Sequence, residues 1–89
     1  MTQRQHHDLK SFPAHFQPAI EGRKTFEIRR NDRNFQSGDT VTLHEYSYDH
    51  GDQYTGRTHS GIIGYIDTFA QQDGYVVFSI ERPGMVIVK

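Results

Sequence analysis

Hydrophobic side chains recur at two different spacings along the chain, and the spacing changes at Gly22. The segment before this glycine repeats an aromatic or aliphatic residue every four positions, at Phe12, Phe16 and Ile20. With Ser11 and Pro13 as good first-turn residues, this spacing predicts a short helix that Gly22 ends in a left-handed conformation. Because Pro18 removes the bond to the carbonyl of Ala14, we expect a kinked or two-piece helix of about two turns.

After Gly22 the chain alternates between apolar and polar residues, which is the pattern of half-buried strands. In the first such segment, Thr25–Arg30, Phe26 and Ile28 share one face, and we expect that face to turn into the core. The opposite face carries Glu27 and Arg29.

Turn-forming residues separate the remaining predicted strands. Gln36–Asp39 predicts a turn, and Asp49-His50-Gly51-Asp52 predicts a hairpin turn. The strands expected around them are Thr40–Tyr48, Gln53–His59, Ile62–Ile66, Tyr75–Glu81 and Met85–Val88. Gly56, Gly61 and Gly64 mark bulges or tight bends that let a small sheet curl and close.

The composition favours the same fold class. The chain holds 7 Ile, 5 Val and 7 Thr against 2 Leu and 3 Ala, and branched side chains pack well on pleated surfaces. With 89 residues there is room for one domain, residues 1–89. We therefore expect a mainly β (α+β) fold, a small bent β-barrel with one short N-terminal helix.

Cysteine content and hydropathy exclude several classes of protein. The absence of Cys rules out a disulfide framework and a thiolate site, and it fits a reducing compartment such as the cytoplasm. The apolar runs are far shorter than the roughly 20 residues that span a bilayer, so we expect a soluble protein with no membrane partner. We expect a monomer with no cofactor.

Positive charge is concentrated in one stretch. Residues 23–33 carry +3 although the whole chain carries -1, and the cations there are Arg23, Lys24, Arg29, Arg30 and Arg33. A solvated strand face explains such a strip. The predominance of Arg also favours planar, bidentate recognition of phosphate, and we expect Arg23, Arg30 and Arg33 to contact phosphates.

Gly22-Arg23-Lys24-Thr25-Phe26-Glu27-Ile28-Arg29 resembles the G-x-K-x-x-E-x-R signature of ASCH domains, a branch of the PUA-like superfamily of small β-barrels linked to RNA. The chain is also similar to the DUF3850 family over nearly its whole length. The residues that carry this wider likeness are His7, Leu9, Lys10, Lys24 to Arg29, Asn31-Asp32-Arg33, Gly38-Asp39, Tyr54-Thr55-Gly56-Arg57 and Gly74-Tyr75-Val76-Val77.

The signature residues predict a binding site. Glu27 and Arg29 lie two apart on one strand face, where a carboxylate can hold a guanidinium while both keep hydrogen-bonding capacity. Lys24 reaches that face only if it lies in a turn that precedes the strand, and we expect this geometry. The resemblance implies a cleft between the helix and the barrel that accepts a nucleotide or a base, within reach of Lys10. Asn31 and Asp32 are better explained as a turn with Asx hydrogen bonds.

The same resemblance implies a rival, enzymatic function. Some small ASCH proteins are amidohydrolases that deacylate N4-acetylated cytidine with a Lys, a Thr nucleophile and a Glu. Lys24 matches that Lys, but Glu27 stands where the Thr would fall, and the late helical insertion that supplies the third group is missing. A different hydrolysis, with Glu27 as general base and Lys24 as electrophile, remains an alternative.

Other candidate residues lie on the later strands. His44, Glu45 and His50 lack the H-E-x-x-H spacing, and we expect no metal site. Tyr46, Tyr48 and Tyr54 flank the hairpin and either stack bases or stabilise the strand pair, with Tyr46 nearest the expected cleft. We expect a module that binds RNA or a nucleotide. The alternatives are a nucleoside-modifying amidohydrolase and a module that binds an acidic protein.

Overall fold

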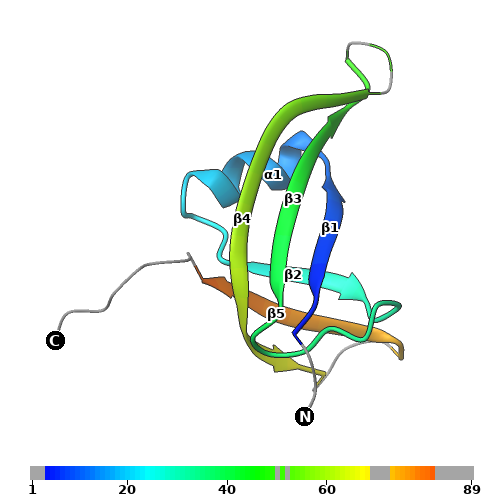
Figure 1. Ribbon diagram of the computed structural model, residues 1–89. Coiled ribbons are helices and arrows are strands. Elements are labelled where there is room, and N and C mark those ends of the chain that lie inside the picture. The colour runs from blue at the N-terminus through cyan, green and yellow to red at the C-terminus, as the bar shows by residue number, and fades with distance from the viewer. Residues whose placement is uncertain (1–3, 50, 52, 69–72, 82–89) are drawn as a thin grey trace, which may run out of the picture.

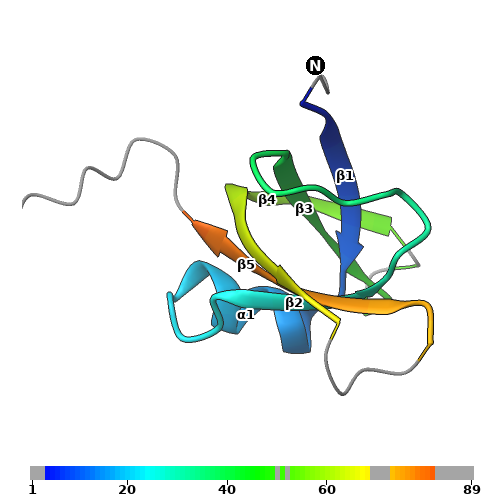
Figure 2. The same ribbon diagram turned by 90° about the horizontal axis from the view of Figure 1, so that it is seen from below.

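A computed structural model describes residues 4–49, 51, 53–68 and 73–81, and these residues form one curled sheet and one helix. In chain order the elements are β1 (His6–Ser11), α1 (Pro13–Ile20), β2 (Phe26–Arg30), β3 (Thr40–Ser47), β4 (Gln53–Asp67) and β5 (Tyr75–Glu81). The strand order is β1-β3-β4-β5-β2, with β1 and β3 parallel and the other neighbours antiparallel. The expected mainly β fold is confirmed, and the sheet curls into a half-barrel (Figure 1 and Figure 2).

The core lies between the inner face of this sheet and α1. Phe16 and Ala19 of α1 are buried, and the helix contacts β3 and β4. The buried hydrophobic residues that form the core are Leu9, Phe16, Ala19, Phe35, Val41, Leu43, Ile63, Val76 and Phe78. The predicted helical stripe is thus confirmed at Phe16, while Phe12 precedes the helix and is 37% exposed.

The helix begins and ends where the sequence predicts. Pro13 occupies its first turn, and Gly22 beyond its end has a φ of 79°, the left-handed conformation expected. The backbone N–H groups of Arg23 and Lys24 both donate to the carbonyl of Pro18, at 3.0 Å each. Pro18 lies inside one continuous helix of eight residues, which has the expected length of about two turns, so the alternative of a two-piece helix is wrong.

The strands predicted at Gln53–His59 and Ile62–Ile66 are one strand, β4, of 15 residues. Its first part pairs with β3 and its last part with β5, so it connects both halves of the curled sheet. The register shifts against β3 between the partners of His44 and Tyr46, where Gly56 lies, and against β5 between Ile63 and Ile66, where Gly64 lies. Both glycines therefore mark bulges, as predicted, whereas Gly61 pairs with Val41 in regular register and marks no bulge.

The expectation that Phe26 and Ile28 turn into the core is wrong. Phe26 is 45% exposed and Ile28 is 54% exposed, whereas Glu27 between them is only 3% exposed. β2 is an edge strand, and its inner face meets the open end of the half-barrel, where two cations pair with Glu27. The alternation was correct, but the charged face is the one turned inward.

The two edge strands of the sheet, β1 and β2, are joined by arginine side chains. Arg29 of β2 donates from Nη2 to the carbonyl of Lys10 at 2.9 Å, and Arg33 donates from Nη1 to the carbonyl of Asp8 at 3.1 Å. Figure 2 shows β1 crossing close to β2 at this side of the molecule. The guanidinium groups thus bridge the edges where a closed barrel would have a backbone ladder.

The turn predicted at Gln36–Asp39 is confirmed and is built around a buried carboxylate. Asp39 is 1% exposed and accepts hydrogen bonds from the backbone N–H groups of Gln5 and Gln36 and from His7 Nε2, at 2.8 to 3.0 Å. Burial raises the pKa of Asp39, but the hydrogen bonds from Gln5, His7 and Gln36 together hold that pKa below its usual range. The turn is therefore tied to the start of β1.

The predictions for the β3–β4 hairpin and for the last strands fall partly outside the described residues. The hairpin between β3 and β4 is confirmed by the pairing of Ser47 with Gln53, while His50 and Asp52 of its turn lie outside the described residues. The strand expected at Met85–Val88 also lies outside them, and Tyr75–Glu81 is confirmed with the same bounds. In the described part of the chain, no helix is long and apolar enough to cross a membrane.

Candidate ligand-binding cleft

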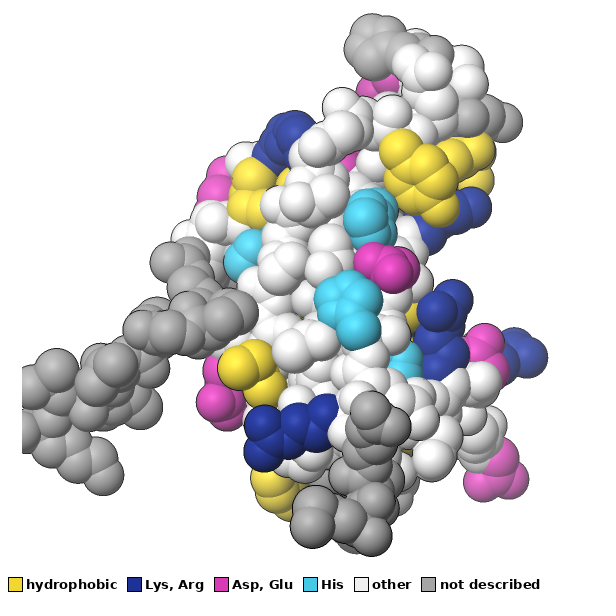
Figure 3. All heavy atoms as spheres, viewed as in Figure 1, with side chains coloured by type: hydrophobic (Ala, Val, Ile, Leu, Met, Phe, Trp, Pro, Cys, Tyr) yellow, Lys and Arg dark blue, Asp and Glu magenta, His cyan; other side chains and the backbone are white. Residues whose placement is uncertain are grey.

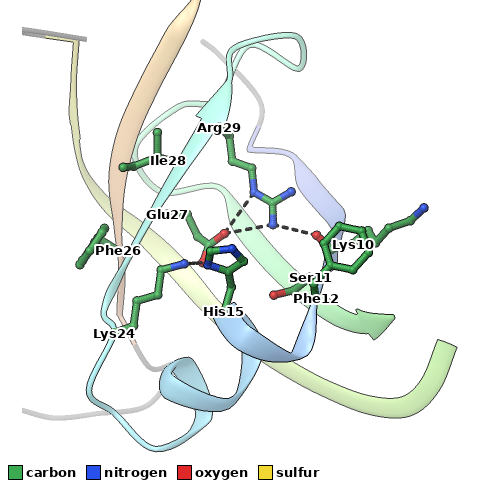
Figure 4. A pocket seen from close by; sticks show the side chains of 9 residues that line it. All are labelled: Lys10, Ser11, Phe12, His15, Lys24, Phe26, Glu27, Ile28 and Arg29. Atoms are coloured by element: carbon green, nitrogen blue, oxygen red, sulfur yellow. Dashed lines mark hydrogen bonds and ion pairs between the residues drawn. The ribbon is translucent and has the colours of Figure 1, made fainter. Parts of the chain in front are cut away.

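A cleft of about 480 Å³ opens between the start of α1, the end of β1 and the inner face of β2. Its volume lies within the roughly 300 to 1,000 Å³ typical of sites for small ligands. The residues that line it are Lys10, Ser11, Phe12, His15, Lys24, Phe26, Glu27, Ile28 and Arg29 (Figure 4). The curvature of the sheet creates this space, because it brings β2 opposite the β1–α1 junction.

Glu27 lies at the centre of the charged wall of the cleft. Its Oε1 atom accepts a hydrogen bond from Arg29 Nε at 3.1 Å, and Arg29 Nη2 lies 3.0 Å from the same oxygen. Lys24 Nζ lies 3.3 Å from Oε2. Figure 4 shows the two cations approaching the carboxylate from opposite sides. A carboxylate this buried needs such partners, because an unpaired buried charge is strongly destabilising.

Lys24 reaches the cleft because the chain turns sharply before β2. Gly22 adopts a positive φ, and the strand begins only at Phe26, so Lys24 lies in the connecting segment. The predicted position of Lys24 in a turn ahead of the strand is therefore confirmed. Its side chain is 20% exposed and Arg29 is 25% exposed, so both cations remain accessible from the cleft.

Two buried oxygen atoms in this cleft lack a hydrogen-bond partner. Of the described residues, Ser11 Oγ and Glu27 Oε2 are the buried side-chain atoms without one. Buried polar atoms in folded proteins are almost always satisfied, so an exception calls for an explanation. Both residues line the same cleft, so the two unsatisfied oxygen atoms lie in its wall.

The structure brings four of the five predicted ligand-binding residues together. Lys10, Lys24, Glu27 and Arg29 all line the cleft. Tyr46, the fifth, lies beside the lining residues: Lys10 Nζ is 4.2 Å from the centre of its ring.

The three arginines predicted to contact phosphates lie outside the lining of the cleft. Arg23 pairs with Glu21 at 2.6 Å and Arg33 bonds to the carbonyl of Asp8. Arg30 lies 5.7 Å from the centre of the Tyr75 ring, and the hydrogen bond with Tyr75 raises the pKa of Arg30 above its ordinary value. Their proposed contacts with phosphate stay predictions.

Sequence reasoning missed Ser11, Phe12 and His15 as cleft residues. Ser11 and Phe12 were assigned to the start of the helix, and His15 was not singled out. The structure instead ends β1 at Ser11 and begins α1 at Pro13, so Phe12 joins the two elements at the mouth of the cleft. The polar-apolar pattern carries no signal for this, since it depends on β2 folding back opposite the junction.

The histidines of the described residues do not gather with other possible metal ligands into a metal site. In that part of the chain, no group of three or more His, Cys, Asp or Glu side chains is arranged to hold a metal ion. His44 Nε2 instead lies 2.8 Å from Asp8 Oδ1, and this hydrogen bond lowers the pKa of Asp8. His44 therefore belongs to the polar outer face of the sheet.

The fold and the cleft together define a small β-rich domain with a polar cleft between the two edges of a curled sheet. Residues 6–80 match the family described as "Domain of unknown function (DUF3850)". The chain belongs to the DUF3850 family, as the sequence resemblance implied.

One curated relative comes from Escherichia phage P2, the "Uncharacterized 12.9 kDa protein in GpA 3'region". It is 42% identical over 40 residues. The matched segment covers 45% of this chain and 37% of the phage protein. The match thus spans little more than a third of that relative, which itself has no described activity.

Proposed function

We propose that this protein binds RNA or a nucleotide, with a nucleobase held in the cleft. The observation that carries the proposal is the burial and incomplete hydrogen bonding of the Glu27 carboxylate. Its carboxylate is buried between two cations in the wall of the cleft, and Oε2, which pairs with Lys24 at 3.3 Å, accepts no hydrogen bond from any described residue. A ligand that donates a hydrogen bond there would satisfy an acceptor that the protein leaves open.

A nucleobase fits the chemistry of this wall. Glu27 Oε2 is an acceptor and Lys24 Nζ, 3.3 Å away, is a donor, so the pair is complementary to neighbouring donor and acceptor groups on one edge of a base. Ser11 Oγ adds a further hydrogen-bonding group. The aromatic side chain of Phe12 adds an apolar surface to the lining, and such side chains favour a planar ring.

The charge of the cleft suits an anionic ligand. Lys24 and Arg29 line it together with a single carboxylate, Glu27, while the Lys10 side chain points away from these three groups toward Tyr46 (Figure 4). The excess of cations attracts a phosphate group attached to the bound base. On a longer strand, Arg23, Arg30 and Arg33 would take further phosphates from outside the cleft.

The proposal agrees with the resemblance between Gly22 to Arg29 and the ASCH signature. The curled five-stranded sheet and the early helix are compatible with a PUA-like domain of the ASCH type, and we assign the chain to that group as part of the proposal. A cytoplasmic location follows from the same proposal, because RNA and nucleotides are found there.

Calorimetric titration with the four nucleoside monophosphates tests this function. We expect at least one to bind with a Kd below about 1 mM. Glu27→Gln should weaken binding by about tenfold to a hundredfold, because it removes a charge-assisted acceptor of nearly the same shape. The matched control is Glu21→Gln, which removes a carboxylate paired with Arg23 outside the cleft and should leave the Kd unchanged. Absence of binding, or equal effects of both substitutions on folded proteins, contradicts the proposal.

The second candidate function is hydrolysis of an amide on a nucleoside. It is favoured by the contact between Lys24 and Glu27 in a cleft that His15 also lines. We expect no turnover of N4-acetylcytidine, because Glu27 replaces the nucleophile and its carboxylate is already held by Arg29. Chromatography of the nucleoside products measures this. Release of cytidine that is lost in Lys24→Ala would establish the enzyme instead.

A further inference from the structure

Four aromatic side chains form a continuous surface at the hairpin end of β3 and β4, here called the aromatic shelf: Phe12, Tyr46, Tyr48 and Tyr54. Phe12 stacks on Tyr48 with ring centres 5.3 Å apart and planes 21° apart. Tyr46 contacts the edges or faces of the other three rings at 5.0 to 6.2 Å, with interplanar angles of 82° to 84°. These contacts fix the rings in place while leaving much of them exposed.

The exposure of the shelf is unusual for this protein. Tyr48 is 64% exposed, Tyr54 is 57% exposed and Phe12 is 37% exposed. Among the described residues, six large hydrophobic side chains are exposed; three belong to the shelf, and Phe26 and Ile28 line the cleft. Only Tyr65 lies elsewhere. Figure 3 shows hydrophobic side chains gathered at this end of the sheet, next to a basic side chain. Clustered exposure of this kind marks an interaction surface.

The shelf is continuous with the cleft. Phe12 belongs to both, since it lines the cleft and stacks on Tyr48. Lys10 also lines the cleft, and its Nζ lies 4.2 Å from the centre of the Tyr46 ring. A cation is therefore positioned at the boundary between the polar cleft and the aromatic shelf.

We propose that the aromatic shelf stacks the base next to the one held in the cleft, so that the ligand is a single-stranded oligonucleotide, and that Lys10 binds the phosphate between the two bases. This inference rests on the proposed function of the cleft. The order of groups on the protein, a polar base site, a cation and then aromatic rings, matches the order base, phosphate, base along a nucleic acid strand. Stacking accepts any base, because every base has a π face, so the shelf adds affinity rather than sequence preference.

Titrations with a mononucleotide and with a pentanucleotide of the same base separate the two sites. The wild-type protein should bind the pentanucleotide at least about tenfold more tightly. Tyr48→Ala should remove most of that gain and leave mononucleotide binding unchanged, while Tyr48→Phe should keep the gain, because the phenyl ring still stacks. The control is Tyr65→Ala, which removes an equally exposed ring on β4 outside the shelf and should change neither affinity.

The outcomes distinguish the two claims. If both ligands bind equally well, or if Tyr48→Ala leaves the pentanucleotide affinity unchanged, the shelf has only a structural role and the inference is overturned, while the function of the cleft stands. If neither ligand binds, both claims fail. If only the pentanucleotide binds and Tyr48→Ala abolishes this, the shelf is supported and the base site in the cleft is contradicted.

Discussion

Glu27 determines the character of the cleft at the scale of single residues. A buried carboxylate is stable here because Arg29 and Lys24 pair with it from two sides, and one oxygen still lacks a hydrogen bond. The sequence predicted that Glu27 and Arg29 share a face and that Lys24 joins them. The prediction that the apolar face of this strand points inward was wrong. Alternation separates two sets of residues, and the apolar set turns inward only where a core is present to receive it.

Asp39 makes a second buried carboxylate that can be tested through stability. Asp39→Asn should lower the free energy of unfolding at pH 7 by about 1.5 to 3 kcal/mol, because the carboxylate accepts hydrogen bonds from Gln5, Gln36 and His7. Urea unfolding measures this. The control, Asp32→Asn, changes a carboxyl that is 63% exposed and should shift stability by less than about 0.5 kcal/mol.

The contribution of Asp39 to the free energy of unfolding should decrease at low pH. The pKa of Asp39 is lower in the folded protein than in the unfolded chain, where Asp has a pKa of about 3.9. The stabilisation is therefore fully present above the pKa of the unfolded chain. It is lost as the pH falls through the lower pKa that Asp39 has in the folded protein. The difference between wild type and Asp39→Asn should shrink below about pH 4. A difference that stays constant down to pH 2 would contradict this account.

At the scale of elements, β4 holds the two halves of the sheet together. The sequence placed Gly56 and Gly64 at bulges correctly, but it divided β4 into two strands, because glycines and polar residues between Gln53 and Ile66 resemble a break. The structure shows why the strand continues through Gly61. A Cβ at this position would lie 2.2 Å from Ile80 Cγ2 and 2.8 Å from the carbonyl oxygen of Glu81. The glycine therefore permits close approach of β5, a property that no single-sequence pattern reveals.

Gly61→Ala tests this close approach. The added methyl group collides with the backbone of β5, so we expect the free energy of unfolding to fall by about 1 to 3 kcal/mol. Chemical unfolding followed by far-ultraviolet circular dichroism measures the change. Thr58→Ala, an exposed position on the same strand, is the control and should change stability by less than about 0.5 kcal/mol. A Gly61→Ala protein as stable as the control would show that β4 and β5 are not packed as described.

At the scale of the whole molecule, the half-barrel remains open between β1 and β2, and the cleft occupies part of that opening. Short-range patterns predicted the strands, the helix and the charged signature. They did not predict that Arg29 and Arg33 bridge the two edges through the carbonyls of Lys10 and Asp8, since these pairs are 19 and 25 residues apart in the sequence. For the same reason Ser11, Phe12 and His15 were missed as cleft residues.

Arg33→Met separates this bridging role from ligand binding. Loss of the bond to the Asp8 carbonyl should lower the free energy of unfolding by about 0.5 to 1.5 kcal/mol, while mononucleotide affinity stays within about twofold, because Arg33 lies outside the cleft. Arg23→Met, at a side chain that is 69% exposed, should change neither quantity. Thermal unfolding and calorimetric titration measure the two effects. Unchanged stability with a large loss of mononucleotide affinity would instead place Arg33 in the binding site.

The most direct test of the central claim is the backbone amide spectrum of the labelled protein during titration with a nucleoside monophosphate. We predict saturable chemical-shift changes concentrated at Lys10–Phe12 and Lys24–Arg29, the two segments that face each other across the cleft. Amides on the outer face of the sheet near Thr42 and Ser60 should not change. Saturable changes centred on that outer face, or no changes at millimolar nucleotide, would contradict the account.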